Sequence, residues 1–467
     1  MNRQSGKDAP LIPRIIPRDQ HTLSRKDISR GALRVLYGLH EAGYRACLVG
    51  GAVRDLLLGG HPKDFDVATD ATPEEVKRLF RNCRLIGRRF RLAHVVFGRE
   101  IVEVATFRGT GDGVDVDEGI DGDRHIVDGR ILRDNVWGDI AEDAVRRDFR
   151  VNALYYDIAD FSVLDYVGGM QDLDKRVLHL IGDPVQRYRE DPVRMLRAAR
   201  LAAKLGFSID PSAAKPFAEL GELLAGAPPA RLFDESLKMF LAGNGLKSLH
   251  ALERYGLLEP LFPATARALA RGDQALRATV EQGLANTDAR VREDKPVTPA
   301  FLFAVLLWGE VRAQAEALVA DGTESGLAWQ RAAHRVMAEQ CQRVAIPRRF
   351  SFAMEEIWAL QPRFTSLTRK RVFRLLAHPR FRAAYDFLLL RGAESAAVRE
   401  LGEWWTRAQD VPQETLAAEL PAGGGRPAAA AAGDAEPAGD GAPKKKRRRR
   451  GGRGGRGGAG RSATKQD

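Results

Sequence analysis

The chain has 467 residues, of which 44% are hydrophobic, so it is long and apolar enough to form several folded domains. Its 73 Lys and Arg residues exceed its 62 Asp and Glu residues, which gives a net charge of +11. Residues 444–467 alone hold eleven Lys or Arg and one Asp, so the first 443 residues are nearly neutral. The basic charge therefore belongs to a tail, and the composition excludes a uniformly basic fold.

Other features argue against a membrane protein and a metal-cluster protein. The longest apolar run, residues 301–308, is too short to cross a bilayer, and the first residues lack the apolar core of a signal peptide. Cys47, Cys83 and Cys341 are odd in number and have no metal-binding spacing, which indicates reduced thiols. We therefore expect a cytoplasmic protein with no membrane span.

The first predicted elements lead into a turn suited to phosphate. An amphipathic helix is expected near residues 28–42, and the apolar residues 46–49 are long enough for a buried strand. Gly50 and Gly51 have no Cβ, so the backbone there can approach a ligand closely. The helix expected at residues 52–58 then presents unpaired N–H groups and the positive end of its dipole to phosphate.

Two carboxylates follow this turn. Asp64 and Asp66 are expected on one face of a second strand, because side chains alternate between faces. Such a pair can bind two Mg²⁺ ions roughly 3.5–4 Å apart, which polarise a phosphate and stabilise a leaving group. A solvated edge strand would have the same spacing. The nearby Gly-Gly turn, with Arg54 as a charge-assisted donor in the following helix, favours the metal site.

The next segments alternate strands, loops and helix starts. Thr72–Glu75 is a capping box that starts a helix, and strands are expected at about residues 93–98 and 101–107. Residues 109–135 are rich in Gly and Asp, but the ligand pattern of a calcium loop is broken. We expect this segment to be a mobile surface loop near the site.

Two polar motifs come next. Residues 146–154 predict a helix or tight turn that places Asp148 and Asn152 on one face. Further on, Asp191 is a suitable N-cap and Pro192 a suitable first residue for another helix. The chain therefore combines a Gly-Gly turn, an acidic pair and two later acidic motifs in a fixed order.

Together these motifs resemble the class II nucleotidyltransferases, a family that comprises bacterial poly(A) polymerases and tRNA CCA-adding enzymes. The resemblance covers about residues 20–260 by motif and reaches residue 410 more loosely. It implies an α+β fold with a polymerase-β-like nucleotidyltransferase head, a small mixed sheet with helices, followed by all-helical parts and a disordered basic tail. The implied domains are an N-terminal extension and helix at 1–44, the head at 45–170, a helical neck and body at 171–290, a C-terminal helical RNA-binding domain at 291–410, a disordered Ala/Gly/Pro linker at 411–443 and the tail at 444–467.

The resemblance also implies a role for each motif residue. Asp64 and Asp66 would bind the metal ions, and Asp148 would be a third functional carboxylate, with Glu103 as its rival. The residues expected to hold the nucleotide are Gly50, Gly51, Arg54, Arg147, Asp191, Arg194 and Arg197. Arg150 departs from the family, which usually has Thr there, and this puts no catalytic role in doubt.

The base-reading residues have a chemical limit. Asp191 supplies a carboxylate, and Arg194 and Arg197 are neighbours on the expected helix. Adenine offers an amine donor to a carboxylate and a ring nitrogen to a guanidinium, whereas uracil and guanine would leave buried polar groups unpaired. Cytosine has the same pattern as adenine. The motif therefore selects ATP and CTP, but it does not separate poly(A) addition from CCA addition.

Other segments favour the poly(A) polymerase branch of the family. Residues 90–98, 103–109, 165–170 and 188–192 are similar to the bacterial poly(A) polymerase form. We therefore expect a template-independent polynucleotide adenylyltransferase that adds AMP from ATP to RNA 3′ ends, in poly(A) tailing and RNA turnover, with two Mg²⁺ ions. The alternatives are a tRNA CCA-adding nucleotidyltransferase and, more distantly, a non-catalytic RNA-binding protein. Protein partners in RNA turnover stay open.

The C-terminal half offers further cations for RNA. On one expected helix, Arg231 and Glu235 could pair at a spacing of four residues. Residues 340–391 interleave basic side chains, which hold phosphates, with aromatic ones, which stack on bases, although Phe at helical spacing is usually core. The tail should be disordered and bind RNA phosphates without reading sequence. Its RNA-binding residues would be Lys444, Lys445, Lys446, Arg447, Arg448, Arg449 and Arg450.

Overall fold

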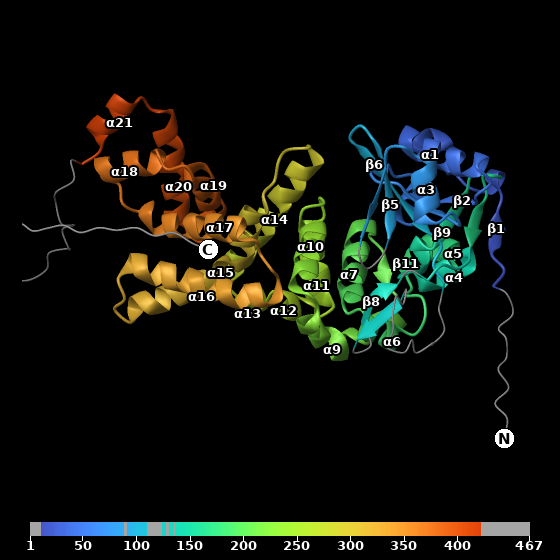
Figure 1. Ribbon diagram of the computed structural model, residues 1–467. Coiled ribbons are helices and arrows are strands. Elements are labelled where there is room, and N and C mark those ends of the chain that lie inside the picture. The colour runs from blue at the N-terminus through green and yellow to red at the C-terminus, as the bar shows by residue number, and fades with distance from the viewer. Residues whose placement is uncertain (1–10, 88–90, 110–123, 128–129, 135, 422–467) are drawn as a thin grey trace, which may run out of the picture. The chain divides into compact units, whose positions relative to one another are not determined.

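The computed structural model describes residues 11–87, 91–109, 124–127, 130–134 and 136–421. An eight-stranded mixed sheet forms the core of the head (Figure 1). Its strands lie in the order β1 (Arg14–Ile16), β10 (Val163–Asp165), β9 (Leu154–Asp157), β2 (Ala46–Val49), β3 (Asp66–Thr69), β6 (Glu100–Thr106), β5 (Leu92–Phe97) and β4 (Cys83–Ile86). β3 and β6 are parallel, and all other neighbours in this sheet are antiparallel.

Both faces of this sheet are covered, which explains why β2 is a continuous apolar run. Leu48 points into the large core, to which helix α1 (Arg30–Glu41) contributes its apolar stripe. Cys47 and Val49 point to the opposite face, where helix α4 (Ile140–Arg146) closes a smaller cluster. The buried strand and the amphipathic helix expected from the sequence are therefore confirmed.

Helix α2 (Gly51–Leu57) follows β2 directly and ends at the predicted glycines. The N–H of Gly59 donates to the carbonyl of Leu56 at 3.0 Å, and the N–H of Gly60 donates to that of Asp55 at 2.7 Å. Gly59 has φ of 76°, so this is the left-handed stop that glycine permits. The stop lets the chain turn back at once toward β3.

Two local expectations need correction. The predicted surface loop at 109–135 contains an antiparallel hairpin of β7 (Arg124–Val127) and β8 (Arg130–Asp134), and most of the remaining loop lies outside the described residues. The N-terminal extension contributes β1 to the sheet edge, where it pairs with β10. The residues between β7 and β8 are Asp128 and Gly129, a dipeptide typical of two-residue hairpin turns, so the sequence carried a signal for the hairpin that was missed. The pairing of β1 with β10 joins segments about 150 residues apart, and no local pattern indicates it. The capping box, in contrast, starts helix α3 (Pro73–Leu79) as predicted.

After the head the chain is helical, as expected, apart from a short parallel pair of β11 (Val177–Leu178) and β12 (Ser208–Ile209). The helices are α5 (Gly169–Lys175), α6 (Pro184–Glu190), α7 (Val193–Leu205), α8 (Pro211–Ala214), α9 (Phe217–Leu220), α10 (Pro229–Phe240), α11 (Gly245–Arg254), α12 (Leu258–Leu261), α13 (Pro263–Ala270), α14 (Gln274–Arg292), α15 (Pro299–Ala320), α16 (Ser325–Arg343), α17 (Arg348–Leu360), α18 (Arg369–Leu376), α19 (Phe381–Leu390), α20 (Ala396–Asp410) and α21 (Gln413–Glu419). Within the described residues, no helix is both long enough and apolar enough to cross a membrane.

The last helices enclose an apolar cluster of their own around Trp405 and Phe364. Leu416 and Leu420 are buried in this cluster, so residues 411–421 are ordered and the expected disordered linker does not begin at residue 411. Leu416 and Leu420 are four residues apart, so both face the cluster, whereas the composition of the segment did not indicate an ordered helix. The basic tail, with the predicted RNA-binding residues 444–450, lies outside the described residues.

The left-handed stop after α2 gives the first prediction. Gly59→Ala should lower the free energy of unfolding by about 1 kcal/mol, because a Cβ is unfavourable at this backbone conformation. The measurement is urea denaturation followed by circular dichroism. Gly221→Ala is the control, since Gly221 has φ of −54° and its added Cβ would lie 3.6 Å from Pro260. Equal stability of both variants would contradict the role of the stop.

Candidate active site

The Gly-Gly turn lies against the acidic motif. Gly50 caps α2 with φ of 74°, a conformation that favours glycine. A Cβ placed on Gly50 would lie 3.6 Å from a terminal guanidinium nitrogen of Arg147 and 3.8 Å from Oδ2 of Asp66. The turn, one carboxylate and one predicted nucleotide-binding arginine are therefore brought together, as the sequence analysis expected.

Strand pairing places a second carboxylate beside Asp66. In the parallel pair of β3 and β6, Asp66 is the register partner of Glu103. Asp64 lies two residues before β3 rather than on it, and buried Phe65 stands between the two aspartates. Asp64, Asp66 and Glu103 are all exposed. Neither aspartate side chain has a hydrogen bond or ion pair with any described residue.

The pKa of Asp66 is raised to about 6, chiefly because neighbouring protein groups desolvate its carboxyl although the residue as a whole is exposed. The negative charges of Glu103 and Asp64 act in the same direction, while Arg147 acts in the opposite direction. Carboxylates that repel one another and lack protein donors suit a divalent cation, whose charge relieves the repulsion. No three His, Cys, Asp or Glu side chains form a ready metal cage in the described part of the chain. The residues that fit a metal are Asp64 and Asp66, with Glu103 adjacent.

The two rivals for third carboxylate have different surroundings. Asp148 accepts from Nε and a terminal nitrogen of Arg197 at 2.8 and 2.6 Å, and from Nδ2 of Asn152 at 3.1 Å. Burial alone would raise the pKa of Asp148, but Arg197 and Asn152 lower it to about 2. Asp148 is therefore ionised and already engaged by protein donors, whereas exposed Glu103 lies beside Asp66 and contacts His94 at 3.2 Å.

Arg54 points inward rather than toward solvent. Its side chain is only 4% exposed, its Nε donates to Asp55 at 2.8 Å and a terminal nitrogen donates to Oδ1 of Asn152 at 2.5 Å. Asp55 also accepts from Nζ of Lys204 on α7, at 2.8 Å. Arg54 also lies against the Gly-Gly turn, because a Cβ added to Gly51 would be 3.3 Å from one of its terminal nitrogens. Its contact with a triphosphate stays a prediction.

Three ion pairs of helix α7, and a fourth from Asp191 just before it, join this segment to the head and to α10. On the head side, Arg197 pairs with Asp148 and Lys204 with Asp55. On the other side, the pairs are Asp191 with Arg231 and Arg200 with Glu235. The predicted pair within α10, Arg231 with Glu235, is therefore wrong. Local spacing showed only the partner one turn away, whereas tertiary packing supplies each residue with a partner from the α7 segment.

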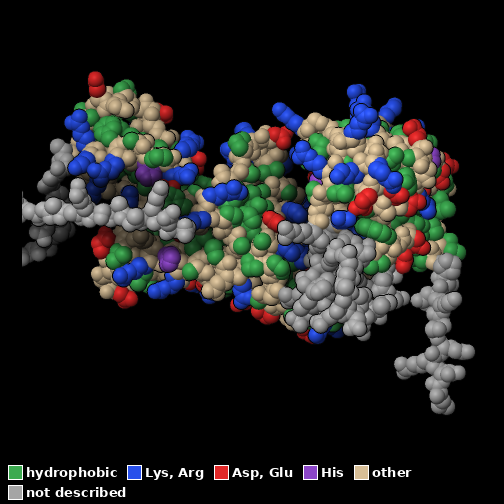
Figure 2. Space-filling model, viewed as in Figure 1, with side chains coloured by type: hydrophobic (Ala, Val, Ile, Leu, Met, Phe, Trp, Pro, Cys, Tyr) green, Lys and Arg blue, Asp and Glu red, His purple; other side chains and the backbone are tan. Residues whose placement is uncertain are grey.

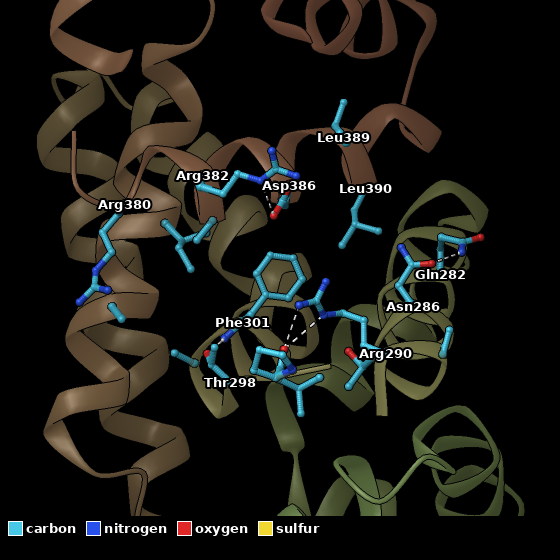
Figure 3. A pocket seen from close by; sticks show the side chains of 18 of the residues that line it. Gln282, Asn286, Arg290, Thr298, Phe301, Arg380, Arg382, Asp386, Leu389 and Leu390 are labelled. Carbon is cyan, nitrogen blue, oxygen red and sulfur yellow. Dashed lines mark hydrogen bonds and ion pairs between the residues drawn. The ribbon is translucent and has the colours of Figure 1, made fainter. Parts of the chain in front are cut away.

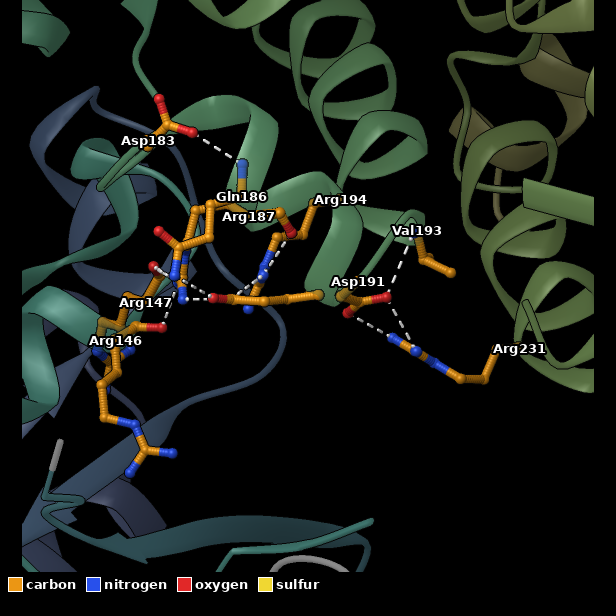
Figure 4. Close-up of polar contacts among 10 residues, drawn as sticks. Arg146, Arg147, Asp183, Gln186, Arg187, Asp191, Val193, Arg194 and Arg231 are labelled. Atoms are coloured by element: carbon orange, nitrogen blue, oxygen red, sulfur yellow. Dashed lines mark hydrogen bonds and ion pairs between the residues drawn. The ribbon is translucent and has the colours of Figure 1, made fainter. Parts of the chain in front are cut away.

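Asp191 and Arg194 are fixed at the start of α7 (Figure 4). Asp191 precedes the N-cap Pro192 instead of being the cap itself, and its Oδ1 accepts from the N–H of Val193 at 3.3 Å. Arg231 donates to both its oxygens at 3.0 and 2.9 Å. Burial would raise the pKa of Asp191, but the Arg231 hydrogen bonds hold it below its usual value. The carboxylate is thus an ionised acceptor with a fixed orientation.

Arg187 on α6 belongs to the same polar network as Arg194, and it was not among the residues predicted from the sequence. One terminal nitrogen donates to the carbonyls of Arg146 and Arg147 at 2.8 and 2.7 Å (Figure 4). The other donates to Glu190, which also accepts from Arg194 at 3.1 Å. Nothing in the sequence distinguishes Arg187 from its neighbours, because its partners are backbone carbonyls about 40 residues earlier.

Three protein-family models match this chain. Residues 46–179 match "Poly A polymerase head domain", residues 206–269 match "Probable RNA and SrmB- binding site of polymerase A", and residues 321–453 match "Polymerase A arginine-rich C-terminus". The chain is also 53% identical over 398 residues to poly(A) polymerase I of Escherichia coli O6:H1, which covers 84% of both chains. The chain belongs to the bacterial poly(A) polymerase family.

CCA-adding enzymes are more distant relatives. The CCA-adding enzyme of Bacillus subtilis is 36% identical over 230 residues, which are 49% of this chain and 55% of that protein. Among solved structures, the CCA-adding enzyme of Bacillus stearothermophilus in complex with CTP is 25% identical, covers 81% of both chains and has a TM-score of 0.53. The expected fold, a nucleotidyltransferase head followed by helical domains, is therefore confirmed.

The basic and aromatic side chains of residues 340–391 separate in space. Phe364 and Phe381 are buried in the C-terminal apolar cluster, so these aromatics are core. The cations face outward, and Lys and Arg side chains gather over α18 (Figure 2). The exposed cations of that helix are Arg369, Lys370, Arg371 and Arg374. Stacking of these two buried rings on RNA is excluded by their burial, while phosphate contact by the α18 cations stays a prediction.

The raised pKa of Asp66 gives a prediction on stability. Its folded value of about 6 lies above the ordinary 3.8, so protonation favours the folded state, and ionisation of the desolvated, repelled carboxyl weakens the folded state as the pH rises from about 4 to 6. In metal-free buffer, Asp66→Asn should therefore raise the Tm by a few degrees at pH 7.5 and by nothing below pH 4. Differential scanning calorimetry across this range measures the difference.

The control is Asp174→Asn, since Asp174 is exposed and has no bonded partner among the described residues. Its Tm should follow that of the parent protein at every pH. A difference in Tm between Asp66→Asn and the parent that does not change with pH would refute the raised pKa of Asp66.

Proposed function

We propose that the protein is a template-independent polynucleotide adenylyltransferase that adds AMP from ATP to RNA 3′ ends. The observation that carries this proposal is the 53% identity with poly(A) polymerase I across 84% of both chains. The match to a CCA-adding enzyme is weaker and spans about half of the chain. The RNA 3′-hydroxyl attacks the α-phosphorus of ATP, the bond to the β-phosphate oxygen breaks, and pyrophosphate leaves.

In this proposal Asp64 and Asp66 hold the metal ions, with Glu103 as the adjacent third carboxylate. When bound, two Mg²⁺ ions would polarise the α-phosphate and favour ionisation of the attacking hydroxyl. The Gly-Gly turn lets the triphosphate approach the backbone because no Cβ intervenes. Asp148 serves the site indirectly, since its ionised carboxylate positions Arg197 and Asn152.

The proposed adenine site consists of Asp191 and Arg194. Asp191 is ionised and can only accept, so it favours a base edge that carries an amine. One terminal nitrogen of Arg194 is bound to the Arg187 carbonyl at 2.7 Å and to Glu190, which leaves its other donors for the ring nitrogen. The proposed selectivity for adenine over the smaller cytosine rests on Arg231, which keeps Asp191 in one orientation.

The remaining partners follow from charge. The tail residues Lys444–Arg450 are proposed to hold RNA phosphates without sequence preference, with a strong dependence on salt. The three cysteines are free, which suits the reducing cytoplasm that we propose as the site of action. A protein that only binds RNA would have no need for the repelling carboxylates around Asp66.

The direct test is extension of an unstructured RNA with Mg²⁺ and each nucleoside triphosphate in turn. Asp64→Ala and Asp66→Ala should each lower AMP incorporation at least about a thousandfold, because each removes a metal ligand. Product length is read on denaturing gels, and circular dichroism checks the fold. The control, Asp174→Ala, should retain full activity. An active Asp66→Ala enzyme would sink the assignment of the metal site.

The second test concerns nucleotide choice. Arg231→Ala should raise the KM for ATP several-fold and increase CTP incorporation relative to ATP, because Asp191 loses its bidentate partner. Arg231→Lys should give a KM for ATP and a CTP-to-ATP ratio between those of the parent and of Arg231→Ala, since lysine keeps the charge but cannot form the bidentate contact. Competition between labelled ATP and CTP measures the ratio. Arg331→Ala, an exposed arginine on α16, is the control. An unchanged ratio in Arg231→Ala would refute this role.

Repair of a truncated tRNA by CTP and ATP, without extension of the unstructured RNA, would assign the protein to the CCA-adding alternative. Long tails from ATP alone support the proposed polymerase.

A further inference from the structure

A large cleft, well away in sequence from the catalytic residues, opens among helices α14, α15, α17 and α19 (Figure 3). Its volume is about 990 Å³, at the upper end of the range for small-molecule sites. Its lining runs from Ala278 to Ala393, whereas every residue of the site described above precedes residue 236. We name it the α14–α19 cleft.

The interior of the α14–α19 cleft offers a surface on which a flat ring can lie. Phe301 projects into it from the first turn of α15 (Figure 3). Its ring is half-buried and packs edge-on against Phe387 at 6.1 Å, so it is held in place. Ala300, Ala353 and Ala383 line the cleft with small side chains and leave room beside the ring. Nucleobases stack on such aromatic surfaces.

One wall carries a coupled pair of amides. Gln282 and Asn286 lie one turn apart on α14, are exposed and line the cleft. Nε2 of Gln282 donates to Oδ1 of Asn286 at 2.7 Å, which leaves a carbonyl oxygen and an amide N–H₂ without a mutual partner. If the amide oxygen and nitrogen of both side chains were exchanged, one free acceptor and one free donor would still remain. One acceptor and one donor side by side match the hydrogen-bonding edge of a nucleobase.

The same wall carries an unneutralised cation. Arg290, one turn beyond Asn286, donates to the carbonyl of Pro296 at 3.3 and 3.0 Å and has no carboxylate partner among the described residues. The other charged lining residues are each in an ion pair, namely Arg380 with Glu356, Arg382 with Asp386, and Glu293 with Lys295. The excess charge of the lining is therefore positive and belongs to Arg290, which suits a phosphate.

We propose that the α14–α19 cleft binds single-stranded RNA, with a base against Phe301 and the amide pair and a phosphate against Arg290. This rests on the proposed function, because the bound strand would be the part of the growing tail behind the 3′ end. The cleft would hold the product between additions, so its loss shortens tails without slowing a single addition.

The test is binding of a fluorescent 15-nucleotide oligoadenylate to the full chain, measured by anisotropy without ATP or Mg²⁺. A salt concentration near 0.3 M weakens the contribution of the basic tail. We expect Arg290→Gln, and separately the double variant Gln282→Ala with Asn286→Ala, to raise the Kd at least about fivefold. Both should add a single AMP to a saturating short primer at the parental rate and make shorter tails.

Arg335→Gln is the matched control, since this exposed arginine of α16 has no ion-pair partner among the described residues and lies outside the lining. It should bind the oligoadenylate like the parent. The proposal would be overturned if Arg290→Gln bound the oligoadenylate and made tails like the parent. It would also be overturned if Arg335→Gln lost as much affinity for the oligoadenylate as Arg290→Gln. If the parent protein adds no AMP, the proposed function fails, while the anisotropy comparison still decides the role of the cleft.

Discussion

The attachment of α7 by charged pairs is the constraint on which the rest of the site depends. Arg197 and Lys204 join it to the head, while Arg200 joins it to α10. Asp148 and Glu235 are largely buried, so removing the partner of either would leave an uncompensated charge, which commonly costs about 3–5 kcal/mol. The helix that starts beside Asp191 is therefore held in one orientation relative to the head strands.

Two parts of the site that are distant in sequence share one polar ring. Its members are, in order of contact, Lys204, Asp55, Arg54, Asn152, Asp148 and Arg197. The ring begins and ends on α7 and passes beneath the Gly-Gly turn, which Arg54 supports. It therefore links the Gly-Gly turn to helix α7, which begins next to Asp191.

Sequence reasoning succeeded where structure is decided locally and stopped where partners come from far away. The strand before Gly50 and the capping box at Thr72 depend on neighbouring residues, and both are present. The partners of Arg231 and Arg187 depend on how helices pack, and no spacing rule reaches them. Asp148 was placed near Asn152 correctly, but its pairing with Arg197, 49 residues away, required the fold.

The parallel register of β3 and β6 shows the same division between local and distant information. Each strand was predicted, but only their pairing puts Glu103 beside Asp66. A solvent-exposed strand and a metal-binding strand can have the same sequence pattern, and only the neighbouring strand in the sheet distinguishes them. The repulsion between Asp66 and Glu103 thus results from the pairing of β3 with β6 and not from either sequence motif alone.

The polar ring also has a consequence for how this protein can change over time. Asp148 is largely buried and Arg197 is its ion-pair partner, so a change at Arg197 alone would leave a charge without a counter-charge in a poorly hydrated place. Lys204 is 42% exposed and Asp55 also pairs with Arg54, so Lys204 can change at little cost. Inherited variation at Asp148 and Arg197 should therefore come as compensating pairs, and a mutational survey should find strong epistasis between these two positions, which lie 49 residues apart.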